Sequence, residues 1–287
     1  MSGDAVTQID LEALRRWIGR SERYVDTVTP RLVASLRATL EGVDCGLEPE
    51  ERSVPHCIHW CLAPEVFPIS ALGCDGHGVR GGLLPPAPLS RRMWAGGEVV
   101  FAEPVQLGDE VVRVSRIEDV RLKEGASGTL CFITLRHELS TARGLAVTER
   151  QDIVYRGLSA GGASAGHKSV KRPEPRWERR ITCGPVRLFR YSALTFNSHR
   201  IHYDADYCRN QEQYPGLVVQ GPLQASLLLE FAASIRQGQR PRSLTFRAVA
   251  PLFAGEVQLG ATDSQGGLEL YVSDANGRPT MIASASW

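Results

Sequence analysis

Apolar residues at helical spacing predict one long buried helix in the second half of the chain. After Gly221-Pro222, large apolar side chains recur every three or four residues, at Leu223, Leu227, Leu228, Phe231 and Ile235. The opposite face of this segment carries only small or weakly polar residues, so we expect other elements to surround the helix. The helix is predicted to run to Gly238, because glycine commonly ends a helix.

Two further helices are predicted near the N-terminus. The stretch DLEALRRWIGR, residues 10–20, is amphipathic. Thr29 and Pro30 are the residue types favoured at the N-cap and first position of a helix.

Alternating apolar and polar positions predict β-strands through most of the remaining chain. In the first half the pattern is clearest in VVRVSRIEDVRL, GTLCFITLRHELS and AVTERQDIVYR. In the second half it occurs in FRAVAPLF, EVQLGAT, LELYVSD and PTMIASASW. A curved antiparallel sheet wrapped around the long helix is the simplest arrangement, which makes the fold class α+β.

A linker and an internal repeat predict that the chain consists of two related halves. Residues 157–176 are rich in Gly, Ala, Ser, Lys and Pro and have almost no large apolar residue, as in linkers. The pattern Pro-x-x-x-Gly-acidic occurs at 104–109 and again at 251–256, each time after an aromatic-bearing strand pattern. We therefore predict an N-terminal domain, residues 1–156, and a C-terminal domain, residues 177–287.

Composition excludes several classes of function. The 287 residues are 43% hydrophobic and 23% charged with a net charge of +1, as in an ordinary globular protein without a basic surface for nucleic acid. No apolar run is long enough to span a membrane, and the acidic, amphipathic N-terminus does not resemble a secretory signal. Seven scattered cysteines suit reduced thiols, so we expect a cytoplasmic protein.

The segment LTFNSHRIHYD, residues 194–204, is the main candidate for chemistry. It places Asn197 five residues before His202, with His199 between them. Spacing alone fits a polar turn with a hydrogen-bonded histidine as well as it fits a site that holds a water molecule.

The sequence around this segment resembles a known enzyme family. RYSALTFNSHRIHYDADY, followed by YPGLVVQGPLQASLLLEFA, is similar to the hydratase motif of the MaoC-like, double-hotdog enoyl-thioester hydratases and dehydratases. LGCDGHGVRGGLLPPAPLSRRMWAGGEVVF is similar to their N-terminal domain, so the resemblance covers nearly the whole chain. It is strongest for the mesaconyl-C4-CoA and itaconyl-CoA hydratases and the mitochondrial-type 3-hydroxyacyl-ACP dehydratases.

The resemblance implies a double hotdog, with two hotdog units that each wrap a curved antiparallel sheet around a helix. It also implies a ligand site between the halves, with the first half as a degenerate copy that shapes the acyl pocket. The family motif is usually Asp-x4-His, but the aspartate position here is Asn197 and the histidine is His202. A carboxylate is therefore missing from the acid–base role at that position.

Hydration of an α,β-unsaturated thioester needs a base for water, a polarised carbonyl and a proton for the α-carbon. Among the motif residues, only His202 has an intrinsic pKa suited to moving that proton. Asn197 exchanges no proton, but its amide can orient a water molecule. His202 would then both take and return the proton unless another acid is supplied, and His199 fits an orienting or solvent-exposed role as well as a catalytic one.

Gly221 is the candidate for polarising the thioester carbonyl. A glycine at a helix N-terminus offers a free backbone N–H and the positive end of the helix dipole. The family places its oxyanion donor at the matching glycine, and an ordinary helix start is the alternative interpretation.

Two other motifs are given a structural interpretation. GHGVRG, residues 76–81, matches a dinucleotide-binding pattern, but the prolines of GLLPPAPL prevent the helix that such a site requires. HCIHWC, residues 56–61, resembles a metal-binding cluster without a second ligand pair at zinc-finger spacing. We therefore expect no cofactor and no metal.

The adjacent pair Arg91-Arg92, next to Trp94, could clamp a substrate carboxylate or a CoA phosphate, or form a solvated basic turn. The predicted catalytic residues are Asn197, His202 and Gly221. The predicted substrate-binding residues are Arg91, Arg92, Trp94, His199 and Tyr203.

The predicted function is reversible hydration of an α,β-unsaturated acyl-CoA, with a branched C5 dicarboxylic acyl group such as that of itaconyl-CoA or mesaconyl-C4-CoA, giving citramalyl-CoA. The alternatives are a 3-hydroxyacyl-ACP or -CoA dehydratase of fatty acid metabolism, a hotdog thioesterase and a non-catalytic acyl-thioester binder. The expected partner is the acyl-CoA thioester, not nucleic acid or membrane, and a homodimer is compatible with this prediction.

Overall fold

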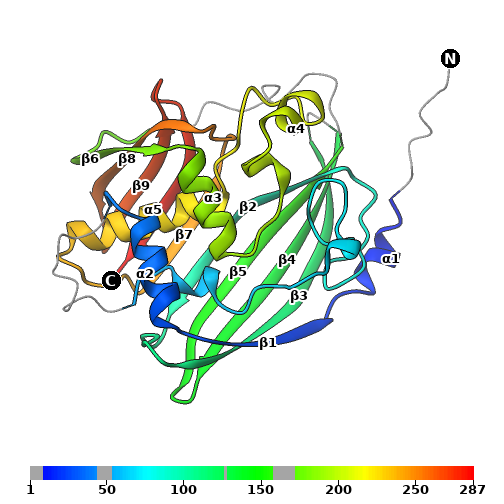
Figure 1. Cartoon of the computed structure of the whole chain (residues 1–287), viewed down its shortest axis with the longest axis horizontal. Coiled ribbons are helices and arrows are strands. Elements are labelled where there is room, and N and C mark those ends of the chain that lie inside the picture. The colour runs from blue at the N-terminus through cyan, green and yellow to red at the C-terminus, as the bar shows by residue number, and fades with distance from the viewer. Residues whose placement is uncertain (1–8, 44–53, 126–127, 158–171) are drawn as a thin grey trace.

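The protein is described by a computed structural model that covers residues 9–43, 54–125, 128–157 and 172–287. Ten antiparallel strands form one continuous sheet in the order β1-β3-β4-β5-β2-β7-β10-β9-β8-β6 (Figure 1). The strands of the first half are β1 (Ser21–Thr27), β2 (Arg91–Phe101), β3 (Glu110–Gly125), β4 (Gly128–Thr141) and β5 (Gly144–Arg156). Those of the second half are β6 (Trp177–Cys183), β7 (Ser243–Ala248), β8 (Gly255–Ser264), β9 (Gly267–Asp274) and β10 (Pro279–Ser286).

The strand order is symmetric about the centre of the sheet. Reading outwards from the central pair β2–β7, β5 matches β10, β4 matches β9, β3 matches β8 and β1 matches β6. The two copies of Pro-x-x-x-Gly-acidic precede or enter the matching strands β3 and β8. This symmetry supports the repeat inferred from the sequence. The predicted linker lies largely outside the described residues, so the boundaries at 157 and 176 stay a prediction.

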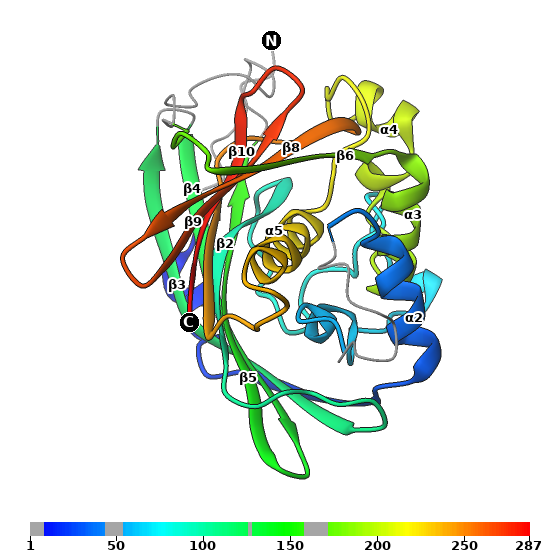
Figure 2. The same cartoon turned by 90° about the vertical axis from the view of Figure 1, so that its left-hand side faces the viewer.

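The longest helix of the described chain, α5 (Gly221–Ile235), is buried on nearly every side. It contacts the strands of the second half and reaches β2 of the first. Figure 2 shows it enclosed between the sheet and the helices α2 and α3. The helix ends three residues before Gly238, whose backbone N–H bonds to the carbonyl of Ala233 at 2.8 Å. The buried helix predicted from apolar spacing is confirmed.

The other helices are short. They are α1 (Leu11–Arg15), α2 (Pro30–Thr39), α3 (Pro185–Leu194) and α4 (Ala205–Asn210), with the 3-10 helices η2 (Ile58–Cys61), η3 (Ile69–Ala71) and η5 (Arg200–His202). The hydroxyl of Thr29 caps α2 by accepting from the N–H of Leu32 at 3.2 Å, as the sequence predicts. The helix predicted over residues 10–20 is shorter than expected, because it gives way to a turn after Arg15.

The first half contains no counterpart of α5 among its described residues. Between α2 and β2, the described residues form η2, η3 and an extended loop that runs to residue 90. No helix of the described chain is long and apolar enough to cross a membrane. All six described cysteines are free thiols.

Candidate active site

A single cavity of about 820 Å³ is lined by both halves of the chain. Asn197, His199, His202 and the first residues of α5 border it from the second half. The exposed side chains Ile69, Phe189, Phe196 and Tyr203 also line it and mark its mouth. The buried residues His59 and Glu149 mark its floor.

Asn197 is fixed by the turn that follows α3. Its backbone N–H bonds to the carbonyl of Ser192 at 2.8 Å, and its side-chain oxygen accepts from the backbone N–H of His199 at 3.0 Å. This second bond is an Asx turn, which occupies the side-chain oxygen. The NH₂ group is left as the group that can hold a water molecule.

His202 lies in η5 and is buried, yet its ring borders the cavity. Its Nδ1 lies 2.7 Å from the carbonyl oxygen of Val218, so Nδ1 carries the proton and Nε2 is the free acceptor. No hydrogen bond to Nε2 is found within the described ranges. Burial lowers the pKa of His202 to about 4, which keeps the imidazole neutral at neutral pH, with the Nε2 lone pair free to accept a proton.

Gly221 begins α5 with no side chain capping the helix. A Cβ atom at this position would lie 2.5 Å from the ring of Trp94, so only glycine allows this close approach. Trp94 in turn stacks on Phe246, with ring centroids 4.4 Å apart. The uncapped amide end of a fifteen-residue helix therefore faces the cavity beside a fixed indole.

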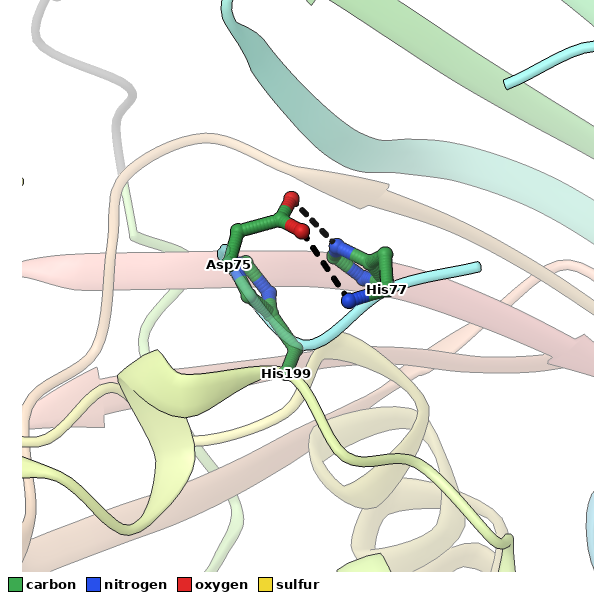
Figure 3. A group of neighbouring side chains, drawn as sticks. All are labelled: Asp75, His77 and His199. Atoms are coloured by element: carbon green, nitrogen blue, oxygen red, sulfur yellow. Dashed lines mark hydrogen bonds and ion pairs between the residues drawn. The ribbon is translucent and has the colours of Figure 1, made fainter. Parts of the chain in front are cut away.

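A pair that the sequence prediction missed comes from the first half. Asp75 accepts hydrogen bonds from Nδ1 and from the backbone N–H of His77, at 2.9 and 3.0 Å (Figure 3). The ring centroids of His77 and His199 are 3.9 Å apart, and those of His199 and His202 are 5.5 Å apart. Burial lowers the pKa of His77 to about 4 and holds that of His199 well below its usual range.

The loop that carries Asp75 and His77 is hydrogen-bonded directly to the loop of Asn197 and His202, residues 195–204. The backbone N–H of Arg200 donates to the carbonyl of Asp75 at 2.9 Å, and the hydroxyl of Ser198 donates to the carbonyl of Gly76 at 2.6 Å. Any side chain at Gly76 would collide with the backbone of Ser198. The GHGVRG stretch is thus a loop, as expected, but it forms one wall of the site.

Asp75, His77 and His199 are also the one group of three potential metal ligands found in the part of the chain that the structure describes. Their ligand atoms lie within 4.8 Å of one another. Two histidines and one carboxylate are a known ligand set for divalent metals. Here Asp75 and His77 are hydrogen-bonded to each other, an arrangement in which the carboxylate orients the imidazole without an ion.

The structure separates the two adjacent arginines. Arg91 is buried and forms an ion pair with Glu212, with 3.0 Å between Nε and Oε2, and it does not line the cavity. Arg92, the next residue on β2, does line it, as does Trp94. The pairing of Arg91 is therefore structural, which leaves Arg92 as the candidate of the two for a ligand contact.

The remaining predicted positions take different places. Tyr203 lies at the mouth, half exposed, where its hydroxyl donates to the carbonyl of Ser198 at 3.2 Å. In the 56–61 stretch, Cys57, His59 and Cys61 are buried in or beside the core. The Nε of Arg240 donates to Nδ1 of His56 at 3.3 Å. This stretch packs beneath the cavity and does not bring its side chains together as a ligand set.

Comparison with known proteins identifies the family. A family model described as hydroxyacyl-thioester dehydratase type 2 matches residues 56–254, well over half of the chain. A mesaconyl-C4-CoA hydratase from Chloroflexus aurantiacus is 39% identical over 238 residues, which cover 83% of this chain and 84% of that protein.

Two solved structures show the same fold at low sequence identity. A MaoC-like dehydratase from Phytophthora capsici has a TM-score of 0.68 at 14% identity, covering 97% of this chain and 98% of that one. A conserved hypothetical protein from Mycobacterium tuberculosis, described as a double hotdog fold, has a TM-score of 0.56 at 13% identity, covering 93% and 95%. The fold is the double hotdog expected from the sequence, and the chain belongs to the hydroxyacyl-thioester dehydratase type 2 family of hydro-lyases.

Proposed function

We propose that this protein adds water reversibly across the double bond of an α,β-unsaturated acyl-CoA. The observation that carries the proposal is the meeting of three groups in one cavity: the Nε2 of His202, the amide of Asn197 and the uncapped start of α5 at Gly221. These are a base, a water-orienting donor and a receptor for negative charge on oxygen.

In the proposed reaction, Nε2 of His202 takes a proton from the water molecule held by Asn197. The water oxygen then bonds to the β-carbon, and the electron pair of the double bond moves towards the thioester carbonyl. The backbone N–H of Gly221 receives the enolate oxygen. A proton returned to the α-carbon completes the addition, and the same steps in reverse eliminate water.

The pair Asp75–His77 is proposed to support this proton transfer. A carboxylate that accepts from Nδ1 holds the imidazole in one tautomer and stabilises the imidazolium form. His77 lines the cavity and contacts His199, which itself contacts His202. We infer that Asp75 compensates for the positive charge that arises when His202 takes the proton. The carboxylate that position 197 lacks is then supplied by the first half.

The proposed acyl group is a branched C5 dicarboxylic one, as in mesaconyl-C4-CoA or itaconyl-CoA, with citramalyl-CoA as the product. The support is the 39% identity to a mesaconyl-C4-CoA hydratase and the position of Arg92 on the cavity wall. The alternative is dehydration of a 3-hydroxyacyl thioester, favoured by the name of the family whose model matches.

The decisive experiment offers the purified protein a panel of enoyl-CoAs: mesaconyl-C4-CoA, itaconyl-CoA, crotonyl-CoA and 2-octenoyl-CoA. Enone absorbance and free thiol are followed together. We expect absorbance to fall without thiol release, fastest with a dicarboxylic substrate. Thiol release would indicate a thioesterase, and a preference for 2-octenoyl-CoA would favour the fatty-acyl alternative.

A further inference from the structure

The floor of the cavity is polar, which a hydrocarbon chain would not require. On the cavity-facing side of β3, β4 and β5, apolar residues lie towards both ends and belong to two separate core clusters. Between the clusters, three adjacent strands carry polar residues, paired in register as Ser115 with His137 and His137 with Glu149. The cavity-lining members of this polar floor are Arg113, His137, Glu149 and Gln151.

Most of these groups are fixed by the protein. His137 uses both ring nitrogens, with Nδ1 at 2.7 Å from the hydroxyl of Ser115 and Nε2 at 2.9 Å from the side-chain oxygen of Gln151. Glu149 accepts from the indole N–H of Trp60 at 3.1 Å. The floor is therefore a preorganised arrangement of polar groups.

Arg113 is the exception. Its Nε is buried without a hydrogen-bond partner, and no carboxylate of the described residues lies within ion-pair distance of its guanidinium. Its guanidinium lies over the ring of Tyr24, 5.5 Å from the centroid. A desolvated cation without an ion pair is costly, and an anion entering the cavity would remove that cost.

We propose that the polar floor binds a carboxylate at the far end of the acyl group, with Arg113 as its cationic contact. This inference rests on the proposed function and deepens it, because it names the residues that bind the end of the acyl group. These residues lie outside the sequence motif and are distinct from Arg92. An arginine can bind a carboxylate through two parallel hydrogen bonds, which gives selectivity as well as affinity.

The acidic groups near the floor are compatible with an anionic ligand. Glu65 and Glu149 both act electrostatically on Arg113, and burial raises the pKa of each. The pKa of Glu149 is about 7, so its protonated form can donate a hydrogen bond to a ligand carboxylate at neutral pH and below. His137 is neutral, because burial lowers its pKa to about 4.

The test uses binding of saturated thioesters, which cannot react. Succinyl-, glutaryl- and adipyl-CoA are compared by calorimetry with butyryl-, pentanoyl- and hexanoyl-CoA, so that each pair differs mainly in the terminal carboxylate. We expect the wild-type protein to bind at least one carboxylated member roughly ten- to hundredfold more tightly than its partner. Arg113→Met should abolish that preference and leave binding of the uncharged series within about threefold.

Arg136→Met is the matched control, because Arg136 is on β4 but on the exposed face. It should keep the preference. Arg113→Gln, which stays polar and of similar length, replaces Arg113→Met if the latter does not fold, and should also lose the preference. A wild-type protein that binds both series equally, or a preference that survives loss of Arg113, would overturn the inference.

The two proposals fail in different ways. A protein that hydrates crotonyl-CoA but shows no preference for carboxylated ligands would keep its proposed reaction and lose the carboxylate site. A protein that prefers carboxylated ligands through Arg113 but hydrates none of the enoyl-CoA panel would keep the site and lose the proposed reaction.

Discussion

The two halves of the sheet share one strand order but differ in what fills their concave faces. The second half holds α5 and the loop of Asn197 and His202. Its concave face is filled by an apolar core that first-half residues such as Leu36 and Val99 also join. The first half has no helix of that kind among its described residues, and its strands present Arg113, His137 and Glu149 to the cavity. The second half therefore brings the start of α5 and His202 to the cavity, and the first half brings the polar floor and the loop of Asp75 and His77.

The comparison also shows why both halves are needed for one site. The loop of Asn197 and His202 donates hydrogen bonds to the backbone carbonyls of Asp75 and Gly76. The start of α5 is packed against Trp94 of β2. Each contact joins a residue of one half to a residue of the other. Neither half alone therefore encloses the cavity.

Replacing His202 with alanine should have the largest effect on activity. Loss of a general base costs on the order of 10²–10⁴ in rate, and Asn197 on the same loop cannot take a proton. Initial rates with the preferred enoyl-CoA measure the loss, and circular dichroism serves as the folding control. If the variant retained more than a third of wild-type activity, His202 would not be the base, and the second half would not supply it.

Asp75→Asn tests whether the first half takes part in proton transfer. The amide keeps the shape of the side chain but removes the negative charge proposed to compensate for the imidazolium at His202, so we expect kcat to fall roughly 10- to 100-fold with KM nearly unchanged. ¹⁵N NMR of the histidines should show that His77 loses its preference for the Nδ1–H tautomer. Asp204→Asn is the control, since Asp204 pairs with Arg200 outside the cavity. An unchanged kcat with an altered tautomer would leave His77 a structural role only.

Asn197→Ala should lower kcat by about tenfold and leave KM nearly unchanged, because orienting water helps mainly in the transition state. Asn197→Asp restores the commoner family residue and keeps the Asx turn to His199. An inactive, folded aspartate variant would mean that a site with a carboxylate at Asp75 requires a neutral group at 197. An active variant would mean that the two side chains hold water equally well.

Arg92→Met should reduce kcat/KM for mesaconyl-C4-CoA by roughly threefold and spare crotonyl-CoA, because Arg92 on the cavity wall adds longer-range attraction to the carboxylate that Arg113 is proposed to contact. Arg91→Met provides the comparison on the same strand. Because Arg91 pairs with Glu212 away from the cavity, its loss should lower stability and affect both substrates equally. Equal losses on both substrates for Arg92→Met would instead point to CoA phosphate binding.

Glu149→Gln changes the polar floor, and its effect on stability can be measured without a ligand. Burial raises the pKa of Glu149 to about 7, above its unfolded value, so folding becomes less favourable as the pH rises from about 4.5 to 7. Glutamine removes this cost and can still accept from Trp60. The variant should therefore gain up to about 3 kcal/mol over wild type at pH 8 and little at pH 4. Urea midpoints at the two pH values measure it, and an equal difference at both would contradict the assignment.

Local patterns in the sequence were enough to predict α5 and most strands, and to single out the loop of Asn197 and His202, which lines the cavity. These features depend on spacing within a few residues, such as the apolar positions of 221–235 or the five-residue interval from Asn197 to His202. Arg91 and Arg92 show the limit of such patterns. Successive residues on a strand point to opposite faces, so only one of the two arginines faces the cavity. The ion pair with Glu212, which lies far away in the sequence, shows that Arg91 is the one unavailable to a ligand.

Only the tertiary structure brought the first half into the site. Asp75 and His77 lie more than a hundred residues before His199, in a stretch whose prolines and glycines indicate nothing more than a loop. In the sequence, Arg113, His137 and Glu149 look like ordinary strand residues. The alternating pattern shows that successive side chains lie on opposite faces, but it does not show which polar side chains line a cavity. The sequence by itself identified Asn197, His202 and Gly221 as the candidate reactive positions of the second half. Long-range strand pairing and loop packing decided which distant charges surround it, since electrostatic contacts depend on distance in space and not on separation along the chain.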